Sequence, residues 1–221
     1  MRLAFLNKIL KPSFIVNYRF IVLEGIDGSG KSTLAENIKK HFSKNHFCIK
    51  LSEPTELNLW GRELRKILKS KASLNEKLSL KLRRLFKKDR LWDIKNRIKP
   101  ALQENKIVIL DRYYFSTAAY QGENQKEADE IMREYTEDNR ILQPDCVLYL
   151  KIKPEYTLKR MAKRNEAEEI FEHKEALQKI FERYEYIVSN YANEAKIIVL
   201  DAGLNEKELA SAALAALNEK R

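Results

Sequence analysis

Five short apolar runs are spaced along the chain, and most of them end at a polar or turn-forming residue. The runs are Phe20 to Leu23, His46 to Leu51, Lys106 to Leu110, Cys146 to Ile152 and Lys196 to Leu200. Short, almost continuous apolar runs of this kind are typical of parallel strands that are buried on both faces.

Helical patterns separate these runs. They cover residues 60–70, 75–103, 126–141, 154–190 with an interruption near 165, and about 205–220. Strand and helix that alternate over the whole length predict an α/β fold, a doubly wound five-stranded parallel sheet with helices on both faces. Because ligands bind beyond the carboxyl ends of the strands in such sheets, we expect the functional residues at that edge.

A glycine-rich stretch follows the first apolar run. Residues 20 to 33 read FIVLEGIDGSGKST, so the pattern G-x-x-x-x-G-K-S lies between a strand and a helix whose apolar face carries Leu34, Ile38 and Phe42. This is the phosphate loop in the context that it requires, which argues against a chance glycine-rich turn. The residues expected to hold the phosphates of ATP are Gly25, Gly28, Ser29, Gly30, Lys31, Ser32 and Thr33.

The chemistry of that loop explains its residue types. Glycines let backbone N–H groups point inward around phosphate oxygens, and the following helix N-terminus favours negative charge. Lys31 can reach the terminal phosphates, and the Ser32 hydroxyl can bind Mg²⁺.

Composition and charge narrow the class of protein. The chain has 221 residues, 44% of them hydrophobic and 33% charged, with a formal net charge of +10. A basic chain binds nucleic acid, an anionic membrane or polyanionic phosphates. The two cysteines, Cys48 and Cys146, fall in predicted strands without metal-ligand spacing, which favours reduced core thiols and a cytoplasmic protein. No stretch reaches the roughly 18 apolar residues of a membrane span.

The domain organisation predicted is an N-terminal extension, residues 1–18, followed by a single phosphate-loop domain, residues 19–221, with a lid segment near 160–172. The extension is basic, apolar and free of acidic residues. It can be a surface amphipathic turn, an organelle-targeting remnant or residues upstream of the true start, and we favour a loosely attached extension.

Asp111 and Arg112 follow a strand of β-branched residues and leucine. In phosphate-loop enzymes an Asp at this point holds Mg²⁺ directly or through water, and the neighbouring Arg can clamp a phosphoryl group with two hydrogen bonds. The alternative is a strand-end turn with an incidental ion pair.

A dense set of cations lies between residues 77 and 99. It can be a basic stripe for nucleic acid or a solvated helix face with Leu78, Leu82, Leu85 and Trp92 turned inward, and we favour the second. Phe86 and Arg90 are four residues apart and share a face, where a ring can stack on a nucleobase while a guanidinium bonds its edge.

A possible flap follows Pro154, which begins a helix. Arg160 and Arg164 are four residues apart and precede an acidic stretch. Cations on a flap can close over a phosphoryl group in transfer and exclude water. Simple pairing of Arg164 with Glu168 within a helix is the alternative.

From about Phe20 to Ala202 the chain resembles the thymidylate kinase family. The resemblance rests on FIVLEGIDGSGKST, SEPT at 52–55, Gly61-x-x-x-Arg65, LFKKDR at 85–90, LDRYYFSTAAYQG at 110–122, PDCVLYL at 144–150 and the segment from Arg160 through Arg164 to Phe171-Glu172.

The resemblance implies ATP and Mg²⁺ as cofactors, dTMP as substrate and a homodimer, with neither nucleic acid nor a membrane as a partner. It implies the substrate-binding residues Asp27, Glu53, Pro54, Arg65, Phe86, Arg90, Arg112, Thr117, Tyr120 and Gln121. It implies the catalytic residues Asp27, Lys31, Asp111, Arg112, Arg160 and Arg164, and the metal-binding residues Ser32 and Asp111.

Among these, Phe86 stacks on thymine in the implied pocket, Arg90 bonds its edge, and Arg112 holds the phosphate of the nucleotide. Thr117 contacts the base, and Tyr120 crowds the 2′ position and favours deoxyribose.

Two positions depart from the family pattern. The family commonly has Arg where this chain has Ser52, before Glu53-Pro54, and we expect Arg65 to replace its contact with the substrate phosphate. Gly28 stands where some members carry Arg, which favours a catalytic cation from the lid, Arg164 first and Arg160 second.

The function expected is phosphorylation of dTMP to dTDP by Mg·ATP, in dTTP biosynthesis. One alternative is a kinase for another nucleotide or deoxynucleoside on the same fold. A second is a phosphate-loop ATP- and nucleic-acid-binding protein, which predicts salt-sensitive binding of DNA or RNA and no small acceptor. A third is an inactive binding module, which Ser52 keeps open.

Overall fold

The computed structural model describes residues 17–70, 75–162, 174–192 and 195–218. Its centre is a five-stranded sheet in the order β2-β3-β1-β4-β5, in which every neighbouring pair is parallel. The strands are β1 (Phe20–Glu24), β2 (Cys48–Ser52), β3 (Ile107–Asp111), β4 (Cys146–Lys151) and β5 (Ile197–Asp201). The predicted fold class is therefore confirmed, including the number of strands.

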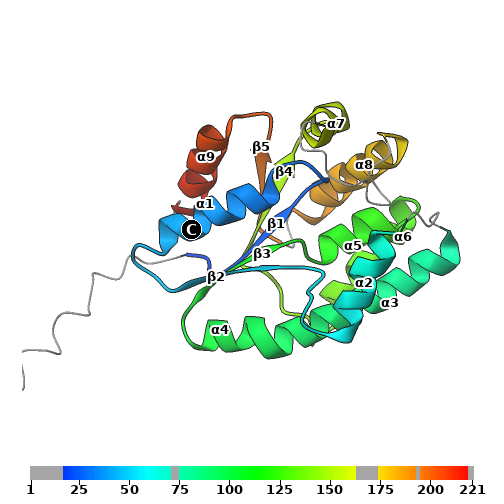
Figure 1. Ribbon diagram of the computed structural model, residues 1–221, viewed down its shortest axis with the longest axis horizontal. Coiled ribbons are helices and arrows are strands. Elements are labelled where there is room, and N and C mark those ends of the chain that lie inside the picture. Colours follow the sequence, from blue (N-terminus) through cyan, green and yellow to red (C-terminus); the bar gives the residue numbers. More distant parts are fainter. Residues whose placement is uncertain (1–16, 71–74, 163–173, 193–194, 219–221) are drawn as a thin grey trace, which may run out of the picture.

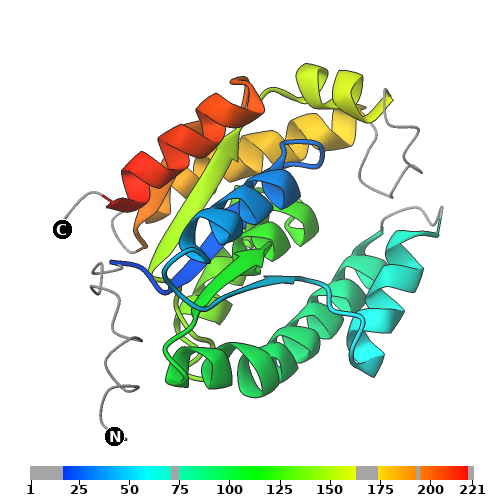
Figure 2. The same cartoon turned by 60° about the vertical axis from the view of Figure 1, so that its left-hand side comes forward.

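Helices cover both faces of this sheet (Figure 1). They are α1 (Lys31–Phe42), α2 (Leu59–Leu68), α3 (Glu76–Asp93), α4 (Lys99–Gln103), α5 (Tyr114–Gln121), α6 (Gln125–Thr136), α7 (Pro154–Ala162), α8 (Lys174–Tyr191) and α9 (Glu206–Asn218). Helices α1 and α9 pack together on one face, and α4, α5, α6 and α8 lie on the other. Helices α2 and α3 pack on each other and lie on the opposite side of the molecule from α9 (Figure 2).

The core forms where the sequence pattern is most apolar. Every residue of β1 and β3 is buried, and β4 is buried up to its last residue. On α1 the predicted face, Leu34, Ile38 and Phe42, packs into the same core. The central strands therefore present their ends, and not their faces, to ligands.

Asparagine side chains cap the first turns of α2, α3 and α6, as Asn205 caps that of α9. The side-chain oxygen of Asn58 accepts the N–H of Gly61 at 2.9 Å, that of Asn75 accepts Leu78 N–H at 2.9 Å, and that of Asn124 accepts Glu127 N–H at 3.0 Å. Each bond satisfies a backbone donor that the first turn leaves open. These caps fix where α2, α3 and α6 begin beside the sheet.

Helix α5 is absent from the helices predicted from the sequence. All eight of its residues are buried, so it has no polar face and no amphipathic period to detect. The helix predicted over 75–103 is also interrupted by a π-helical segment, η1 (Ile94–Ile98), and that over 126–141 ends at Thr136.

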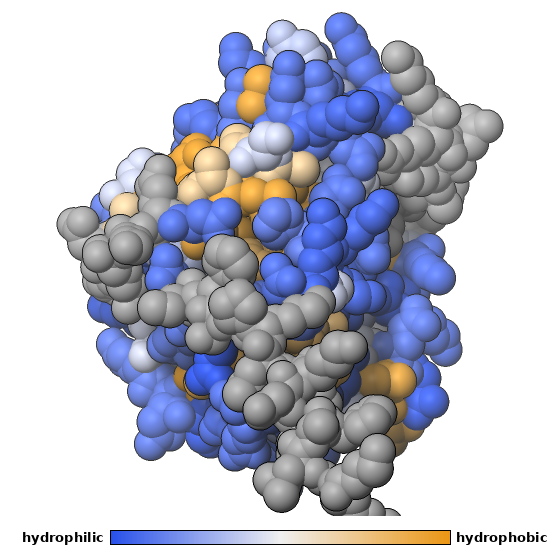
Figure 3. Space-filling view, turned by 90° about the vertical axis from the view of Figure 1, so that its left-hand side faces the viewer, coloured by the Kyte–Doolittle hydropathy of each residue, from blue (hydrophilic) through white to orange (hydrophobic). Residues whose placement is uncertain are grey.

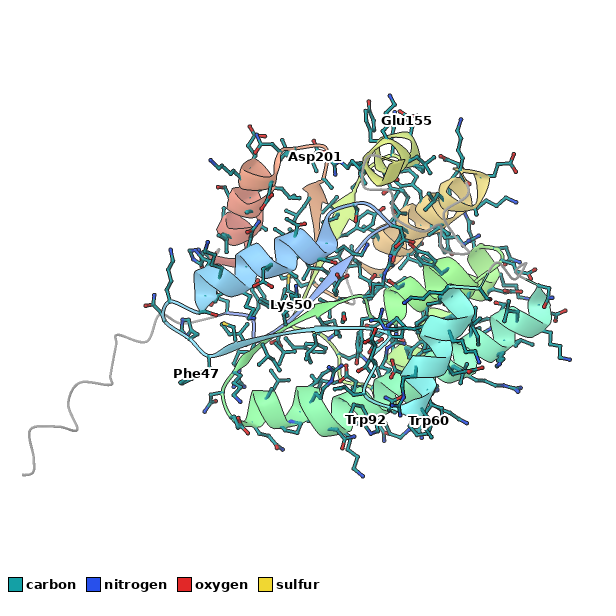
Figure 4. The ribbon with its side chains drawn as sticks, in the orientation of Figure 1. Phe47, Lys50, Trp60, Trp92, Glu155 and Asp201 are labelled. Carbon is teal, nitrogen blue, oxygen red and sulfur yellow. The ribbon has the colours of Figure 1, made fainter. Side chains whose placement is uncertain are left out.

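One face of the molecule is seen in Figure 3. Its coloured part is mostly hydrophilic, with apolar patches between hydrophilic residues. Figure 4 shows Phe47 at the edge of the fold, where it is 80% exposed just before β2, and Lys50, whose ammonium lies 3.0 Å from Glu36 of α1. In the described part of the chain no helix is long and apolar enough to cross a membrane.

Candidate active site

A cavity of about 440 Å³ lies at the carboxyl ends of β1, β2 and β3. The residues that line it come from the phosphate loop, the turn after β2, helices α2 and α3, and the segment from β3 into α5. They are Asp27, Gly28, Gly30, Lys31, Ser32, Thr33, Ser52, Glu53, Pro54, Arg65, Leu68, Lys69, Phe86, Arg90, Asp111, Arg112, Tyr113, Ser116, Tyr120 and Gln121. Fifteen of these twenty are residues to which the sequence analysis assigns a role at the site.

The phosphate loop connects β1 to α1 as predicted. Gly25, Gly28 and Gly30 have φ of 145°, 75° and 98°, values that side chains disfavour. A Cβ on Gly25 would also meet the Leu150 carbonyl oxygen at 2.8 Å. The loop therefore needs glycine at position 25 for two independent reasons, conformation and space.

Lys31 opens α1 and folds back over this loop. Its ammonium donates to the carbonyl oxygens of Gly25 at 2.9 Å and Ile26 at 2.8 Å. Burial and, to a smaller extent, the charge of Arg112 lower the pKa of Lys31 to about 8, against the opposing effect of Asp111 and Asp27. The ammonium is thus placed to exchange loop carbonyls for phosphate oxygens.

Ser32 and Asp111 form the candidate metal site. The Ser32 hydroxyl donates to Oδ2 of Asp111 at 2.6 Å, and Oδ1 of the same carboxylate is buried without a hydrogen-bond partner among the described residues. Hard oxygen ligands of this kind suit Mg²⁺. The described residues contain no cluster of three or more His, Cys, Asp or Glu side chains, and Mg²⁺ held by one carboxylate, phosphates and water needs none.

Arg112 lies between the loop and α5. Its guanidinium forms an ion pair with Asp27, and it donates to Ser116 Oγ at 3.1 Å and Tyr120 OH at 3.2 Å. Tyr120 OH also donates to Asp27 at 2.7 Å. Burial alone would raise the pKa of Asp27, but the charges of Arg112 and Lys31 hold it below its usual value.

Glu53 and Arg90 form a buried ion pair on the opposite wall. Both Nε and Nη2 of Arg90 donate to Oε2 of Glu53, at 2.9 and 2.5 Å, and each side chain is only 1% exposed. The guanidinium lies 4.9 Å from the ring centre of Tyr113 and 4.7 Å from that of Tyr135. Burial raises the pKa of Glu53, and the charge of Arg90 opposes that rise.

Four polar atoms of this pair and of Gln121 lack hydrogen-bond partners among the described residues. They are Oε1 of Glu53, Nη1 of Arg90, and both Oε1 and Nε2 of Gln121. All three residues line the cavity, and so does the half-buried ring of Phe86. Because buried polar atoms are normally paired, these four atoms mark a place where a polar ligand completes the site.

Ser52 ends β2, and Arg65 of α2 bonds the turn that follows it. Arg65 donates to the Pro54 carbonyl oxygen at 2.6 Å, and its Nε lies 3.2 Å from Glu56. Arg65 and Ser52 both line the cavity, and the expectation that Arg65 compensates for Ser52 stays a prediction.

Two predicted site residues outside the phosphate loop, Thr117 and Arg160, do not line the cavity. Thr117 is buried behind Arg90, which donates to its hydroxyl at 3.2 Å. Arg160 donates to the Ala202 carbonyl oxygen at 2.9 Å, beyond the end of β5. Arg164 lies outside the described residues. Gly25 and Ser29 belong to the loop without lining the cavity.

Five cavity residues had no role assigned from the sequence: Ser52, Leu68, Lys69, Tyr113 and Ser116. Lys69 lies four residues after Arg65, a spacing that places it on the same helix face and could have indicated it. Ser116 belongs to α5, the helix that the sequence pattern did not reveal.

Comparison with known proteins adds to this geometry. The sequence model of a family described as thymidylate kinase matches residues 23–213. A thymidylate kinase of Leptospira interrogans is 38% identical over 170 residues, covering 76% of this chain and 81% of that protein. A probable thymidylate kinase of Methanococcus aeolicus is 39% identical over 179 residues, covering 80% and 83%. A thymidylate kinase of Clostridium novyi is 36% identical over 186 residues, covering 81% and 89%.

Proposed function

The chain belongs to the thymidylate kinase family, and we propose that it transfers the γ-phosphoryl group of ATP to dTMP, giving dTDP and ADP. The observation that carries the acceptor assignment is the set of unpartnered atoms on Glu53, Arg90 and Gln121 beside Phe86. A pyrimidine edge carries both hydrogen-bond donors and acceptors, and a ring beside it can stack on its face.

On the donor side we propose that the loop amides and Lys31 bind the β- and γ-phosphates of ATP. Ser32 and Asp111 are the residues that would hold Mg²⁺, which when bound neutralises charge on the phosphate oxygens. Since Lys31 bonds only loop carbonyls and the Ser29 hydroxyl in this structure, phosphate oxygens offer its ammonium stronger, charged partners.

On the acceptor side Arg112 binds the phosphate of dTMP and orients one of its oxygens toward the γ-phosphorus. Tyr120, whose ring lies under the Arg112 guanidinium at 4.9 Å, borders the sugar. Arg65 supplies the second cation on the wall where Ser52 stands. The acceptor oxygen is already ionised near neutral pH, so catalysis consists of in-line positioning and of neutralising charge on the transferring group.

The cation that covers the transferring group is proposed to come from the lid, with Arg164 first and Arg160 second. The homodimer implied by the resemblance and the cytoplasmic location that the two cysteines favour likewise remain proposals. Sedimentation of the full chain measures the first of these, and a mass near twice 26.0 kDa is expected.

The test of the function is release of ADP from Mg·ATP with a panel of acceptors: dTMP, dUMP, dCMP, dGMP, dAMP, the ribose form of TMP and thymidine. We expect the largest kcat/KM with dTMP and little turnover of its ribose form. Comparable turnover of a purine nucleotide or of thymidine would contradict the acceptor site, and no acceptor-dependent ADP would contradict the activity. The methyl group alone separates dTMP from dUMP by about 1–3 kcal/mol.

A further inference from the structure

Glu24 is a carboxylate buried directly behind the acceptor side of the cavity. It ends β1, is 1% exposed and does not line the cavity, so it touches no substrate. Burying an ionised carboxylate is costly unless hydrogen bonds or charges compensate it. Its surroundings therefore show what this carboxylate stabilises.

Four donors surround the two oxygens of Glu24. Oε1 accepts the backbone N–H groups of Tyr113 at 2.7 Å and Ser116 at 3.2 Å, and Oε2 accepts the hydroxyls of Ser116 at 2.6 Å and Tyr184 at 2.9 Å. Four donors on two oxygens is the arrangement of an ionised carboxylate, because a protonated one has fewer acceptor sites. Burial raises the pKa of Glu24, and these bonds and the charge of Arg112 oppose the rise.

The first pair of bonds constrains the backbone at Arg112. Its φ of 71° is in the left-handed region, which a residue with a Cβ adopts only when its surroundings compensate the strain. The N–H that directly follows this residue, that of Tyr113, is the one held by Oε1 of Glu24. By accepting this N–H, the Glu24 carboxylate fixes the orientation of the peptide group between Arg112 and Tyr113.

The second pair constrains the Arg112 side chain. A serine hydroxyl has one proton, and Ser116 gives it to Oε2 of Glu24. The lone pairs of Ser116 Oγ therefore face Arg112, whose Nη1 donates to them at 3.1 Å. Tyr184 OH, by contrast, hydrogen-bonds Glu24 and Ser116, and in the described part of the chain it forms no hydrogen bond with the guanidinium.

We infer that Glu24 is a positioning residue: acting through Ser116 and the Tyr113 peptide, it sets the place and orientation of Arg112 for the phosphate of the acceptor nucleotide. The inference rests on the proposed function, in which Arg112 binds that phosphate. Among the described residues neither carboxylate oxygen of Glu24 forms a hydrogen bond with Lys31 or Ser32, and its charge raises the pKa of Lys31 less than the charges of Asp111 and Asp27 do, so we expect its effect on ATP binding to be small.

The direct test is Glu24→Gln, measured by calorimetric titration of the full chain with dTMP and, separately, with ATP. The amide keeps the shape of the side chain but turns one acceptor into a donor that faces other donors. We expect the Kd for dTMP to rise about tenfold or more, the effect of one unsatisfied buried group, and the Kd for ATP to change less than twofold. Equal weakening of both nucleotides, or a loss of thermal stability with both affinities unchanged, would overturn the inference.

Two smaller substitutions test whether Glu24 acts on Arg112 through Ser116, even if the Glu24→Gln variant does not fold. Ser116→Ala and Tyr184→Phe each remove one hydroxyl that donates to Oε2 of Glu24, and only Ser116 also contacts Arg112. We expect Ser116→Ala to raise the KM for dTMP several-fold without a matching change in the KM for ATP, and Tyr184→Phe to change neither by more than twofold. Equal effects of the two variants on the KM for dTMP would contradict the role of Ser116.

The wild-type titration separates this inference from the proposed function. If the wild-type chain binds no dTMP, the proposed function fails and the inference falls with it. If wild type binds dTMP and Glu24→Gln binds it equally well, the inference alone is wrong.

Discussion

The two ends of the cavity are built in different ways. The donor end is one continuous stretch, residues 25–33, in which we propose that backbone groups and Lys31 bind the phosphates of ATP, and Lys31 bonds the loop itself. The acceptor end is assembled from separate elements: Glu53 after β2, Arg90 on α3, and Arg112 and Gln121 at the two ends of the segment from β3 through α5.

The hydrogen bonding at the two ends also differs. At the donor end the loop holds Lys31 through its own carbonyls, so phosphate exchanges one set of partners for another. At the acceptor end Arg90 and Glu53 bond each other inside the protein, while Oε1 of Glu53, Nη1 of Arg90 and both amide atoms of Gln121 lack hydrogen-bond partners among the described residues. In the function that we propose, the donor end supplies the chemistry, and the acceptor end binds dTMP at a buried pair that also contributes to folding stability.

Lys31→Ala tests the donor end and should have the largest effect on rate. Removing a cation that stabilises the transferring group costs on the order of 10²–10³-fold in kcat. We expect that loss in an ADP-release assay, with the affinity for dTMP nearly unchanged. Near-normal turnover would mean that the loop does not carry the chemistry.

Arg90→Met tests the coupling at the acceptor end. It leaves Glu53 buried without its cation, a loss of about 3–5 kcal/mol in the free energy of unfolding. Urea denaturation measures this loss. The double variant with Glu53→Gln should recover much of the stability while dTMP binding stays weak. If Arg90→Met lowers stability by less than about 1 kcal/mol, the buried pair does not have the role described here.

Gln121→Leu tests the acceptor end in a second way, because it should change the affinity for dTMP without lowering the melting temperature. The Gln121 amide has no hydrogen-bond partner among the described residues, so its removal should leave the melting temperature unchanged or raise it. The Kd for dTMP should rise about tenfold, equivalent to about 1.4 kcal/mol. A lower melting temperature with unchanged dTMP binding would show that the amide is structural.

The smallest effect expected is a pH dependence at the donor end. Phosphate binding needs the protonated Lys31, and burial lowers the pKa of that group to about 8. The kcat/KM for Mg·ATP should therefore fall as pH rises through about 8. Because the folded pKa lies below the unfolded one, folding stability from this group changes in the opposite sense and rises with pH above about 8.

Lys31→Arg is the control for this fall in kcat/KM at high pH, since a guanidinium does not titrate near pH 8. Its kcat/KM, although lower, should not decline near pH 8. A decline of the same size in Lys31→Arg would mean that a group other than Lys31 causes the fall in kcat/KM.

Much of this architecture was predictable from local patterns. Five apolar runs predicted five parallel strands because strands buried on both faces leave a plain signature. Helix α5 was not predictable in the same way, because all of its residues are buried and no period separates an inner from an outer face. The distant placement of Arg160, bonded to Ala202, likewise has no signature in the spacing that suggested a flap.

The sequence by itself determined the donor end. The phosphate loop brings its glycines, Lys31 and Ser32 together within one short stretch of the chain. When interacting residues are that close in sequence, their types determine the local geometry. Only the tertiary structure decided that Glu24 supports Arg112, that Glu53 pairs with Arg90, and that Gln121 lies beside them with its amide open. These contacts join residues dozens of positions apart, and only the packing of strands and helices fixes which of many charged side chains share one buried space.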